Sequence, residues 1–382
     1  MTIALVHDYV TQRGGAERVA LSLARAFPGS PLHTTLYRPE TTFPEFAELD
    51  IRPSRLNRWS VLRNNHRLAL PFLAQTVSRM HIDADIVVAS SSGWAHGIHT
   101  DGRKIVYCHA PARWLYQVDR YAGTDEERSL RRLLVRAASG ALGPGLRRWD
   151  REAADSADLY IVNSTAVRDA VRRIYDIDAE VVYPPVPLMP SNGPEQPVED
   201  IQHPFLLCVA RLLPYKNVDA VIDAIDRLGS IDLVVVGEGP DRERLRARAS
   251  RSGRTRFASA VSDAELRWLY RNCSGLVAAS FEDFGLSPLE AAAFGKPTAA
   301  LRAGGYLDTV RSDETGVFFA EPTSTDIAEA LETMLTHPWQ PATIAAHIEA
   351  FSEPRFIDRL RAVVRNEQDL ARAASEDHRE AP

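Results

Sequence analysis

Two glutamates, Glu282 and Glu290, flank a Phe-Gly turn in the last third of the chain, where residues 281–297 are FEDFGLSPLEAAAFGKP. A strand-like segment, Ser274 to Ala279, comes directly before them. A turn of this kind leaves backbone N–H groups free at the start of a helix, where they can bind an anion. The carboxylates on either side can accept hydrogen bonds from hydroxyl groups. Hydroxyl, phosphate and hydroxyl in this order is the layout of a nucleotide-sugar.

The turn between the two glutamates is the expected anion site. Gly285 removes side-chain bulk where the backbone must approach a ligand, and the residues from Leu286 onward have helical spacing. Glu290 then falls early in that helix, on a turn that faces the loop. We therefore expect the ligand to be bound by Phe284, Gly285, Leu286, Ser287 and Glu290. The alternative is a plain strand–turn–helix with surface glutamates.

A second motif, VARLLPYKN at residues 209–217, follows the first strand-like run of the second half of the chain and precedes a helix. Arg211 and Lys216 therefore sit at the carboxyl end of a strand, where ligands gather in parallel sheets. Arginine offers a planar fork and lysine a point charge, and both suit a diphosphate. The alternative is a solvated basic loop.

Two weaker motifs follow strands in the first half. Gly14 and Gly15 stand at a strand-to-helix turn, where glycines let phosphate reach the amides of a helix N-terminus. The pair is not a GxGxxG fingerprint. His109 ends another strand, and Pro111 follows closely and restrains the backbone. We therefore expect the His109 imidazole to point into a cleft. A structural loop histidine is the alternative.

A metal site is not expected. Asp83 and Asp85 match the DxD motif of many sugar-transferring enzymes, but they precede the strand Ile86–Ala89. That is the wrong end of a parallel strand for a ligand. We therefore predict a turn that begins a strand there, and no metal cofactor.

The composition is that of an ordinary soluble globular protein, with 45% hydrophobic and 25% charged residues. A net charge of −6 argues against nucleic-acid binding. Cys108, Cys208 and Cys273 lie far apart without a CxxC pair, which indicates a reducing cytosol and no structural zinc. The chain begins with a strand, so no signal peptide is expected, and no apolar run reaches about 18 residues. We expect a cytoplasmic protein.

Apolar, β-branched runs alternate with longer amphipathic runs along the 382 residues, which predicts two α/β domains with parallel sheets. Residues 1–184 form the expected Rossmann-like acceptor domain, residues 185–203 a Pro-rich linker and residues 204–353 a Rossmann-like donor domain. Residues 354–382 form a helix that returns to the first domain, plus a tail. We expect ligands in a cleft between the domains.

Together these motifs resemble the family 4 glycosyltransferases, which have the GT-B fold. The resemblance lies in four separated places in the same order: Gly14 to Glu17, His109 to Pro111, Arg211 with Lys216, and the pair Glu282 and Glu290. Within this family, the chain looks most like bacterial mannosyltransferases of surface-glycan or glycolipid pathways. This finer resemblance lies in two pairs of segments, 7–9 with 14–19 and 107–114 with 282–286. Asp283 stands where many relatives have glycine, and Ser287 where many have proline.

The resemblance implies a retaining hexosyltransferase that uses a nucleotide-diphosphate sugar and no metal. It implies that Arg211 and Lys216 hold the diphosphate, Glu290 the ribose and Glu282 the donor sugar, while His109 orients the reacting centre. Gly15 would let the loop approach the phosphates, and the base would lie near residues 257–262. Our first expectation for the donor is GDP-mannose, followed by UDP-glucose or UDP-N-acetylglucosamine. A nucleotide-sugar epimerase and a non-catalytic binding module are the alternatives.

Two stretches are free of acidic residues, between Asp50 and Asp83 and between Glu127 and Asp150, and both combine arginines with apolar residues. Basic amphipathic segments of this kind can lie on anionic membrane surfaces. We therefore expect a glycan or lipid-linked acceptor and peripheral contact with the inner face of the cell membrane. The alternative is a solvated helix face.

Overall fold

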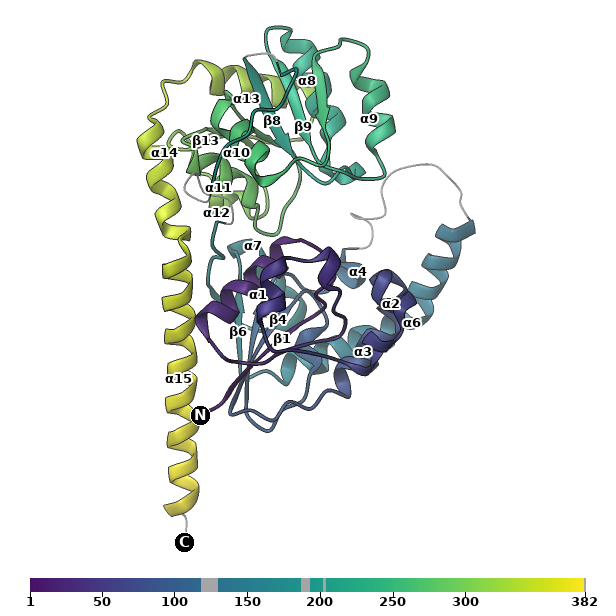
Figure 1. Ribbon diagram of the computed structural model, residues 1–382, viewed down its shortest axis with the longest axis vertical. Helices are drawn as coiled ribbons and strands as arrows, with labels where there is room; N and C mark the ends of the chain where they lie inside the picture. The colour runs from purple at the N-terminus through teal and green to yellow at the C-terminus, as the bar shows by residue number, and fades with distance from the viewer. Residues whose placement is uncertain (118–129, 187–192, 202–203, 381–382) are drawn as a thin grey trace. The chain divides into compact units, whose positions relative to one another are not determined.

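The computed structural model describes residues 1–117, 130–186, 193–201 and 204–380, and these residues form two compact units (Figure 1). Of the described residues, the first unit contains 1–117, 130–185 and 353–380, and the second contains the rest. Each unit is built on one parallel sheet with helices on both faces. This confirms the predicted fold class of two Rossmann-like α/β domains.

The first unit has a seven-stranded sheet in the order β3-β2-β1-β4-β5-β6-β7. Its strands are β1 (Ile3–His7), β2 (Leu32–Thr34), β3 (Ile51–Pro53), β4 (Ile86–Ser91), β5 (Arg103–Cys108), β6 (Leu159–Val162) and β7 (Glu180–Val181). Alternate residues of a strand point to opposite faces. Val87 and Ala89 of β4 therefore join one core, and Ile86 and Val88 join the other.

Helices cover both faces of this sheet. One core is closed by α1 (Gly15–Ala26) and α15 (Glu353–Glu380), and the other by α3 (His66–Ser78), α6 (Leu130–Asp155) and α7 (Thr165–Tyr175). Two short helices, α2 (Ser60–Asn64) and α4 (Arg113–Tyr116), lie in the connections. Figure 1 shows α1 beside the upper part of α15.

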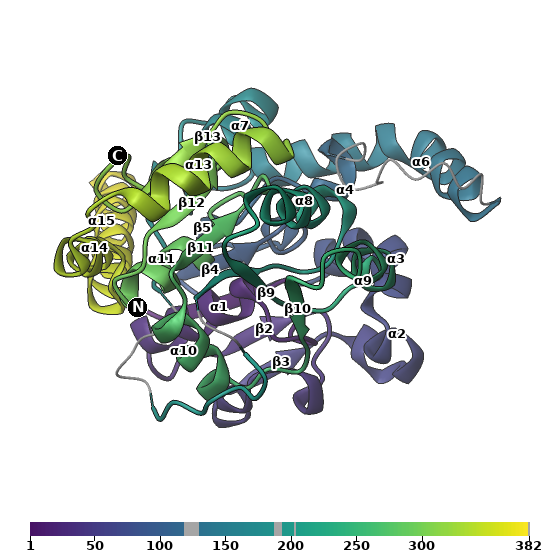
Figure 2. The same cartoon turned by 90° about the horizontal axis from the view of Figure 1, so that it is seen from above.

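The second unit has a six-stranded sheet in the order β10-β9-β8-β11-β12-β13. The strands are β8 (Phe205–Val209), β9 (Asp232–Val236), β10 (Thr255–Ala258), β11 (Gly275–Ala278), β12 (Thr298–Leu301) and β13 (Gly316–Phe319). One face packs on α8 (Val218–Leu228), α9 (Arg242–Ala249) and α13 (Ser324–Thr336), and α8 and α13 lie side by side (Figure 2). The other face packs on α10 (Asp263–Asn272) and α11 (Leu286–Ala293). Two further helices, α12 (Tyr306–Thr309) and α14 (Pro341–His347), complete the unit.

The helix that returns to the first unit is confirmed. Phe356, Leu360 and Val363 of α15 are buried in the core that α1 also covers. At the start of α15, Glu353 accepts hydrogen bonds from the Ser22 hydroxyl and the Arg25 guanidinium, both at 2.7 Å. The segment expected to be a tail is helical as far as Glu380.

The structure adds elements that the pattern does not reveal. Strands β2 and β3 have three residues each, and β3 ends in a proline, so neither shows a strand signature. Helices α2 and α3 are separated by the single residue Asn65, which leaves the helical region with φ −139° and ψ 83°. The described part of the predicted linker packs on α10, where the Gln196 N–H donates to the Ala264 carbonyl at 3.1 Å. Residues 187–192 and 202–203 of that linker lie outside the described residues.

The packing of α15 gives a prediction about stability. Leu360 is 1% exposed, so Leu360→Ala leaves a cavity and should lower the free energy of unfolding by about 2–5 kcal/mol. Leu370 lies on the same helix but is 56% exposed, and Leu370→Ala should change it by less than about 0.5 kcal/mol. Denaturant unfolding of both variants checks this. An equal loss of unfolding free energy in the two variants would contradict the described packing of α15.

Candidate active site

In the second unit, the loop after β8 places Lys216 at the carboxyl edge of the sheet. Lys216 ends a short 3-10 turn, Pro214–Lys216, and is 9% exposed. Asn217 follows in the left-handed region with φ 54°, a conformation that asparagine tolerates better than most residues. Its side-chain amide donates to the Ala279 carbonyl at 2.8 Å. Asn217 therefore fastens the Lys216 turn to the end of the neighbouring strand β11.

The end of β11 leads to Glu282, which meets Lys216. The Lys216 ammonium forms a hydrogen-bonded ion pair with Oε1 of Glu282. The Ser280 hydroxyl donates to the same oxygen at 2.7 Å and lies 3.3 Å from the hydroxyl of Tyr306. Burial, and then the nearby Glu282 carboxylate, raises the pKa of Tyr306 well above its ordinary value. The structure thus brings together two predicted residues, Lys216 and Glu282, and adds Ser280 and Tyr306 as their supports.

The Phe-Gly turn precedes α11 as predicted. Gly285 is the N-cap with φ 86°, a region that glycine occupies without strain, and as a glycine it has no side chain of its own to cap the first helical turn. A segment after β12 fixes the turn, because the Gly305 N–H donates to the Glu282 carbonyl at 2.8 Å. A side chain at Gly305 would collide with the backbone of Phe284. Glycine at this position therefore permits the close approach of two loops.

The other predicted donor residues lie on or next to this turn. Phe284 is buried against Phe351, with ring centroids 6.0 Å apart, while Leu286 and Ser287 are half-buried in the first turn of α11. Glu290 is half-buried, and its Oε2 accepts a hydrogen bond from the Tyr270 hydroxyl at 2.8 Å. Burial, and then Glu290, raises the pKa of Tyr270 well above its ordinary value. Tyr270 is thus a neutral donor that fixes the Glu290 carboxylate.

Arg211 and the expected base segment lie at the same edge of the sheet. Arg211 is exposed, two residues beyond the end of β8. In the segment 257–262, Ala260 has φ 52°, which is a strained conformation for alanine. Strained backbone of this kind clusters at ligand sites.

In the first unit, His109 lies just beyond the end of β5 and is buried. Its Nε2 lies 2.8 Å from the Ser90 hydroxyl at the end of β4. Its carbonyl accepts a hydrogen bond from the side-chain amide of Asn163 at 3.0 Å. Neighbouring strands therefore fix both the ring and the backbone of His109.

Gly14 and Gly15 begin α1, as predicted, but a side chain of this chain lies against their turn. The Glu17 carboxylate is buried so close to Gly14 that a Cβ at position 14 would collide with it. The pKa of Glu17 is raised to about 7, mainly by burial and in small part by the nearby Asp8, while hydrogen bonds from its own N–H and from Gln12 act in the opposite direction. The burial of Glu17 has no signal in the sequence, although its place in the first turn of a helix is typical of a capping carboxylate.

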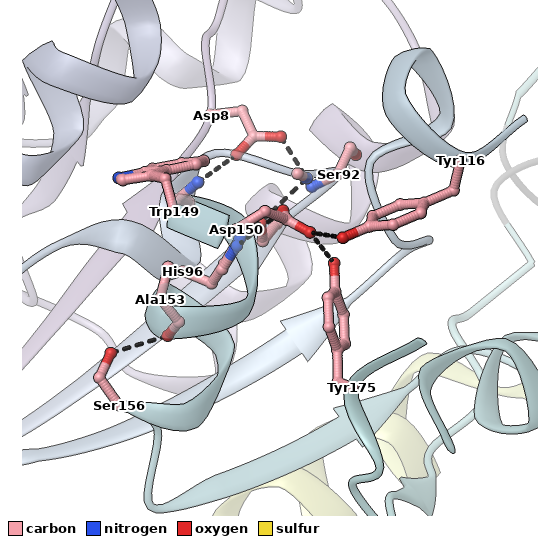
Figure 3. Close-up of polar contacts among 12 residues, drawn as sticks. Asp8, Ser92, His96, Tyr116, Trp149, Asp150, Ala153, Ser156 and Tyr175 are labelled. Atoms are coloured by element: carbon pink, nitrogen blue, oxygen red, sulfur yellow. Dashed lines mark hydrogen bonds and ion pairs between the residues drawn. The ribbon is translucent and has the colours of Figure 1, made fainter. Parts of the chain in front are cut away.

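Two buried carboxylates hold the loop that follows β4 (Figure 3). Asp8 accepts hydrogen bonds from the N–H groups of Ser92 and Ala95 at 2.7 and 2.6 Å, and burial raises its pKa to about 6. Figure 3 also shows Asp150, which accepts from the hydroxyls of Tyr116 and Tyr175 at 2.9 and 2.8 Å.

The interpretation of Asp85 as part of a turn is confirmed. Its carboxylate accepts a hydrogen bond from the Thr2 N–H at 2.5 Å, directly before β4 begins. Among the residues that the structure describes, no group of three or more acidic, histidine or cysteine side chains could hold a metal ion.

Two family profiles match the chain, one in each half. The profile described as Glycosyltransferase Family 4 matches residues 13–189, and the profile described as Glycosyl transferases group 1 matches residues 193–349. The chain belongs to glycosyltransferase family 4. The four motifs that carry the resemblance fall within these two matches.

Curated relatives agree with this family. Human alpha-1,3/1,6-mannosyltransferase ALG2 is 25% identical over 400 residues, which cover 91% of this chain and 92% of that protein. The D-inositol 3-phosphate glycosyltransferase of Mycolicibacterium paratuberculosis is 29% identical over 239 residues, 56% of this chain and 54% of that protein. The chain covers 20% to 54% of the length of the first curated relatives it matches.

Solved structures share the fold. The lipopolysaccharide outer core galactosyltransferase WaaB superposes with a TM-score of 0.64 at 18% identity, over 96% of this chain and all of that one. Anabaena Alr3699/HepE in complex with UDP-glucose gives a TM-score of 0.67 at 18% identity over the same shares. Both similarities support the GT-B fold.

The buried Glu17 carboxyl gives a pH-dependent prediction. Its pKa is about 7 in the folded chain against an ordinary value of 4.5, so the folded state holds more protons between these values. Stability should therefore fall as the pH rises through this window. Glu17→Gln removes this loss, so the variant should gain on the order of 3 kcal/mol relative to wild type between pH 4.5 and pH 8.

Denaturant unfolding at several pH values measures this difference. Glu243→Gln is the control, because the Glu243 side chain is 86% exposed and its replacement should show little pH dependence. A difference between Glu17→Gln and wild type that stays constant with pH would contradict the prediction.

Proposed function

We propose that the protein is a retaining glycosyltransferase. It transfers a hexose from a nucleoside-diphosphate sugar to a glycan or lipid-linked acceptor and requires no metal. The observation that supports this most is the Lys216–Glu282 ion pair beside the open N-terminal turn of α11, with Glu290 held by Tyr270 one turn further on. A cation, the N–H groups of a helix start and two fixed carboxylates at one sheet edge match the parts of such a donor.

Each group has a role that follows from its chemistry. Lys216 and Arg211 hold the diphosphate, and the amides near Gly285 and Ser287 add hydrogen bonds to it. Glu290 accepts hydrogen bonds from the ribose hydroxyls, and Glu282 from hydroxyls of the sugar.

Residues of the first unit have proposed roles in the same reaction. His109 contacts the donor sugar and orients the reacting centre. The turn at Gly14 and Gly15 approaches the phosphates. The acceptor binds to this unit.

The reaction proposed is a displacement on one face of the sugar. The bond from the anomeric carbon to the diphosphate oxygen breaks, and the bond from that carbon to the acceptor oxygen forms. The leaving phosphate takes the acceptor proton, so protons and charge balance without a covalent intermediate. The charge that develops on the leaving group is stabilised by Lys216, Arg211 and the helix amides. Electrostatic stabilisation of this kind is usually the largest contribution to an enzyme's rate enhancement.

The donor proposed is GDP-mannose. The support is the match with ALG2, a mannosyltransferase by name, over 91% of this chain. UDP-glucose or UDP-N-acetylglucosamine is the alternative, because HepE has been solved with UDP-glucose and has the same fold. A nucleotide-sugar epimerase on this scaffold is a second candidate, and it would convert the donor sugar without any acceptor.

Lys216→Ala tests the function. Removing the cation should lower the transfer rate by about 10²–10³-fold, since it stabilises the leaving group. The measurement is transfer from radiolabelled GDP-mannose, UDP-glucose and UDP-N-acetylglucosamine to membrane extract, with excess EDTA in parallel reactions. EDTA should leave the rate unchanged, and strict metal dependence would contradict this part of the proposal.

Lys296→Ala is the matched control, because Lys296 precedes β12 at the opposite edge of the same sheet. It should keep the wild-type rate. A fully active Lys216→Ala enzyme would contradict the diphosphate role, and conversion of the donor without an acceptor would favour the epimerase.

We also propose that α2 and α3 contact an anionic membrane surface. Four large apolar side chains at these helices are 50–68% exposed: Trp59 and Val61 at α2, and Leu68 and Phe72 on α3. Exposed arginines such as Arg58 lie among them in the sequence. Large apolar side chains beside arginines suit the boundary between headgroups and acyl chains. Within the described part of the chain, no helix is long and apolar enough to cross a membrane. In the second basic stretch, residues 127–129 lie outside the described residues, and the side chains of 130–142 are not described.

Sedimentation with vesicles tests this surface. At low salt the protein should co-sediment with vesicles that contain anionic lipid and not with neutral vesicles, because arginines favour anionic headgroups. Replacing Trp59 and Phe72 by serine should weaken binding several-fold, since each apolar side chain contributes on the order of 1 kcal/mol or more. Leu307→Ser is the control, because Leu307 is 54% exposed in the second unit. Equal binding to anionic and neutral vesicles would contradict the proposal.

A further inference from the structure

Three neighbouring strands of the first unit end in a line of hydrogen-bonding side chains. β1 ends at His7, β4 carries Ser90 opposite it in register, and His109 follows the end of β5. Nδ1 of His7 lies 2.9 Å from the Ser90 hydroxyl, and Nε2 of His109 lies 2.8 Å from the same hydroxyl on the other side. All three side chains are buried. One serine hydroxyl therefore joins two imidazole rings.

The backbone around His109 is fixed as firmly as its ring. The His109 N–H donates to the Ser91 carbonyl at 2.8 Å, and the His109 carbonyl accepts from Asn163 at 3.0 Å. The ring also packs edge-on against Tyr107, with centroids 5.2 Å apart. With these contacts in place, the variable left at His109 is the position of its proton.

Both rings are uncharged near neutral pH. Burial lowers the pKa of His109 to about 3, helped by His7 and Arg113. Burial also lowers the pKa of His7 to about 4, against a hydrogen bond that the ring donates to the Ser90 backbone, which raises it. A neutral imidazole has one N–H donor and one acceptor nitrogen, and a serine hydroxyl has a single proton to donate. The Ser90 oxygen could accept from both rings, but its own proton would then lack an acceptor, because the two imidazoles are the partners of this buried hydroxyl among the described residues. One ring must therefore donate to Ser90 and the other must accept from it.

This requirement links the two tautomers. When Nδ1 of His7 carries its proton, Ser90 donates to Nε2 of His109, and the proton of His109 is on Nδ1. When Nε2 of His109 carries the proton, Ser90 donates to Nδ1 of His7, and the proton of His7 is on Nε2. In either case the two rings have the same tautomer.

We propose that the Ser90 hydroxyl couples the tautomers of His7 and His109, which makes His7 and Ser90 positioning residues for His109. Nδ1 of His109 is the ring nitrogen that Ser90 does not engage. The coupling links the donor or acceptor state of this nitrogen toward the substrate to the tautomer of His7. The relevance to sugar transfer rests on the function proposed above, but the coupling itself does not.

Nuclear magnetic resonance tests the coupling directly. Protein labelled with ¹⁵N-histidine shows the tautomer and charge of each ring in long-range ¹H–¹⁵N spectra, and His7→Asn and His109→Asn assign the two signals. At pH 7 both rings should be neutral and of the same tautomer. In Ser90→Ala, which removes only a hydroxyl, both rings should change to a mixture of tautomers. Rings of opposite tautomer, a charged ring at pH 7, or an unchanged His109 signal in Ser90→Ala would overturn the proposal.

Ser91→Ala is the matched control. Ser91 is the next residue of β4, equally buried, and its hydroxyl lies 2.9 Å from Nδ1 of His96 instead. This variant should shift the His96 signal and leave His7 and His109 unchanged. Shifts of His7 and His109 as large as those in Ser90→Ala would indicate a general disturbance of the strand and overturn the assignment to Ser90.

Kinetics test the positioning role. Ser90→Ala should lower kcat by about tenfold, the rate equivalent of one lost hydrogen bond, with the donor KM changed less than about twofold. A wild-type kcat in a variant whose tautomers have changed would overturn that role. If the wild-type protein transfers no sugar from any donor, the proposed function fails, and the spectra still decide the coupling.

Discussion

A nearly buried lysine ammonium held against a carboxylate shapes the site in the second unit. A cation at this depth needs an anionic partner, since an unpaired buried charge is costly. Glu282 supplies that partner, and Asn217 and Ser280 fix the two loops on which Lys216 and Glu282 lie. A diphosphate carries more negative charge than one carboxylate, so the same cation can bind it without reorganising the loops. The rest of the second unit, from the sheet to the Gly305 contact, holds this arrangement in place.

In the first unit, the carboxyl edge of the sheet carries buried polar side chains rather than a paired lysine. Its loops carry polar side chains that are buried, so each must find a hydrogen-bond partner inside the protein. Asp8 binds two backbone amides, Asp150 binds two tyrosine hydroxyls, and Ser90 joins His7 to His109. These networks fix loop positions and proton positions together.

The sequence predicts the parts of the site that local pattern encodes. Lys216, Glu282, Gly285 and Glu290 follow strands or open a helix, and the structure places them at one sheet edge as expected. The supports of these residues are not predictable in this way. Tyr270 reaches Glu290 from another helix, and Tyr306, the first residue of α12, reaches Ser280 from 26 residues further along the chain. Two consecutive glycines, Gly304 and Gly305, stand directly before Tyr306 and resemble the pair Gly14 and Gly15. This glycine pair is the local sequence signal that marks the segment. Strands β2 and β3 were missed because three residues are too few to show a period.

Whether Lys216 binds the diphosphate of a nucleotide-sugar can be measured with a calorimetric cycle. Wild type and Lys216→Ala are each titrated with a nucleoside diphosphate and with the matching monophosphate, for guanosine and for uridine. We predict that the wild type binds one diphosphate much more tightly than its monophosphate and that Lys216→Ala loses most of this preference. A preference that is the same in both proteins would contradict the account.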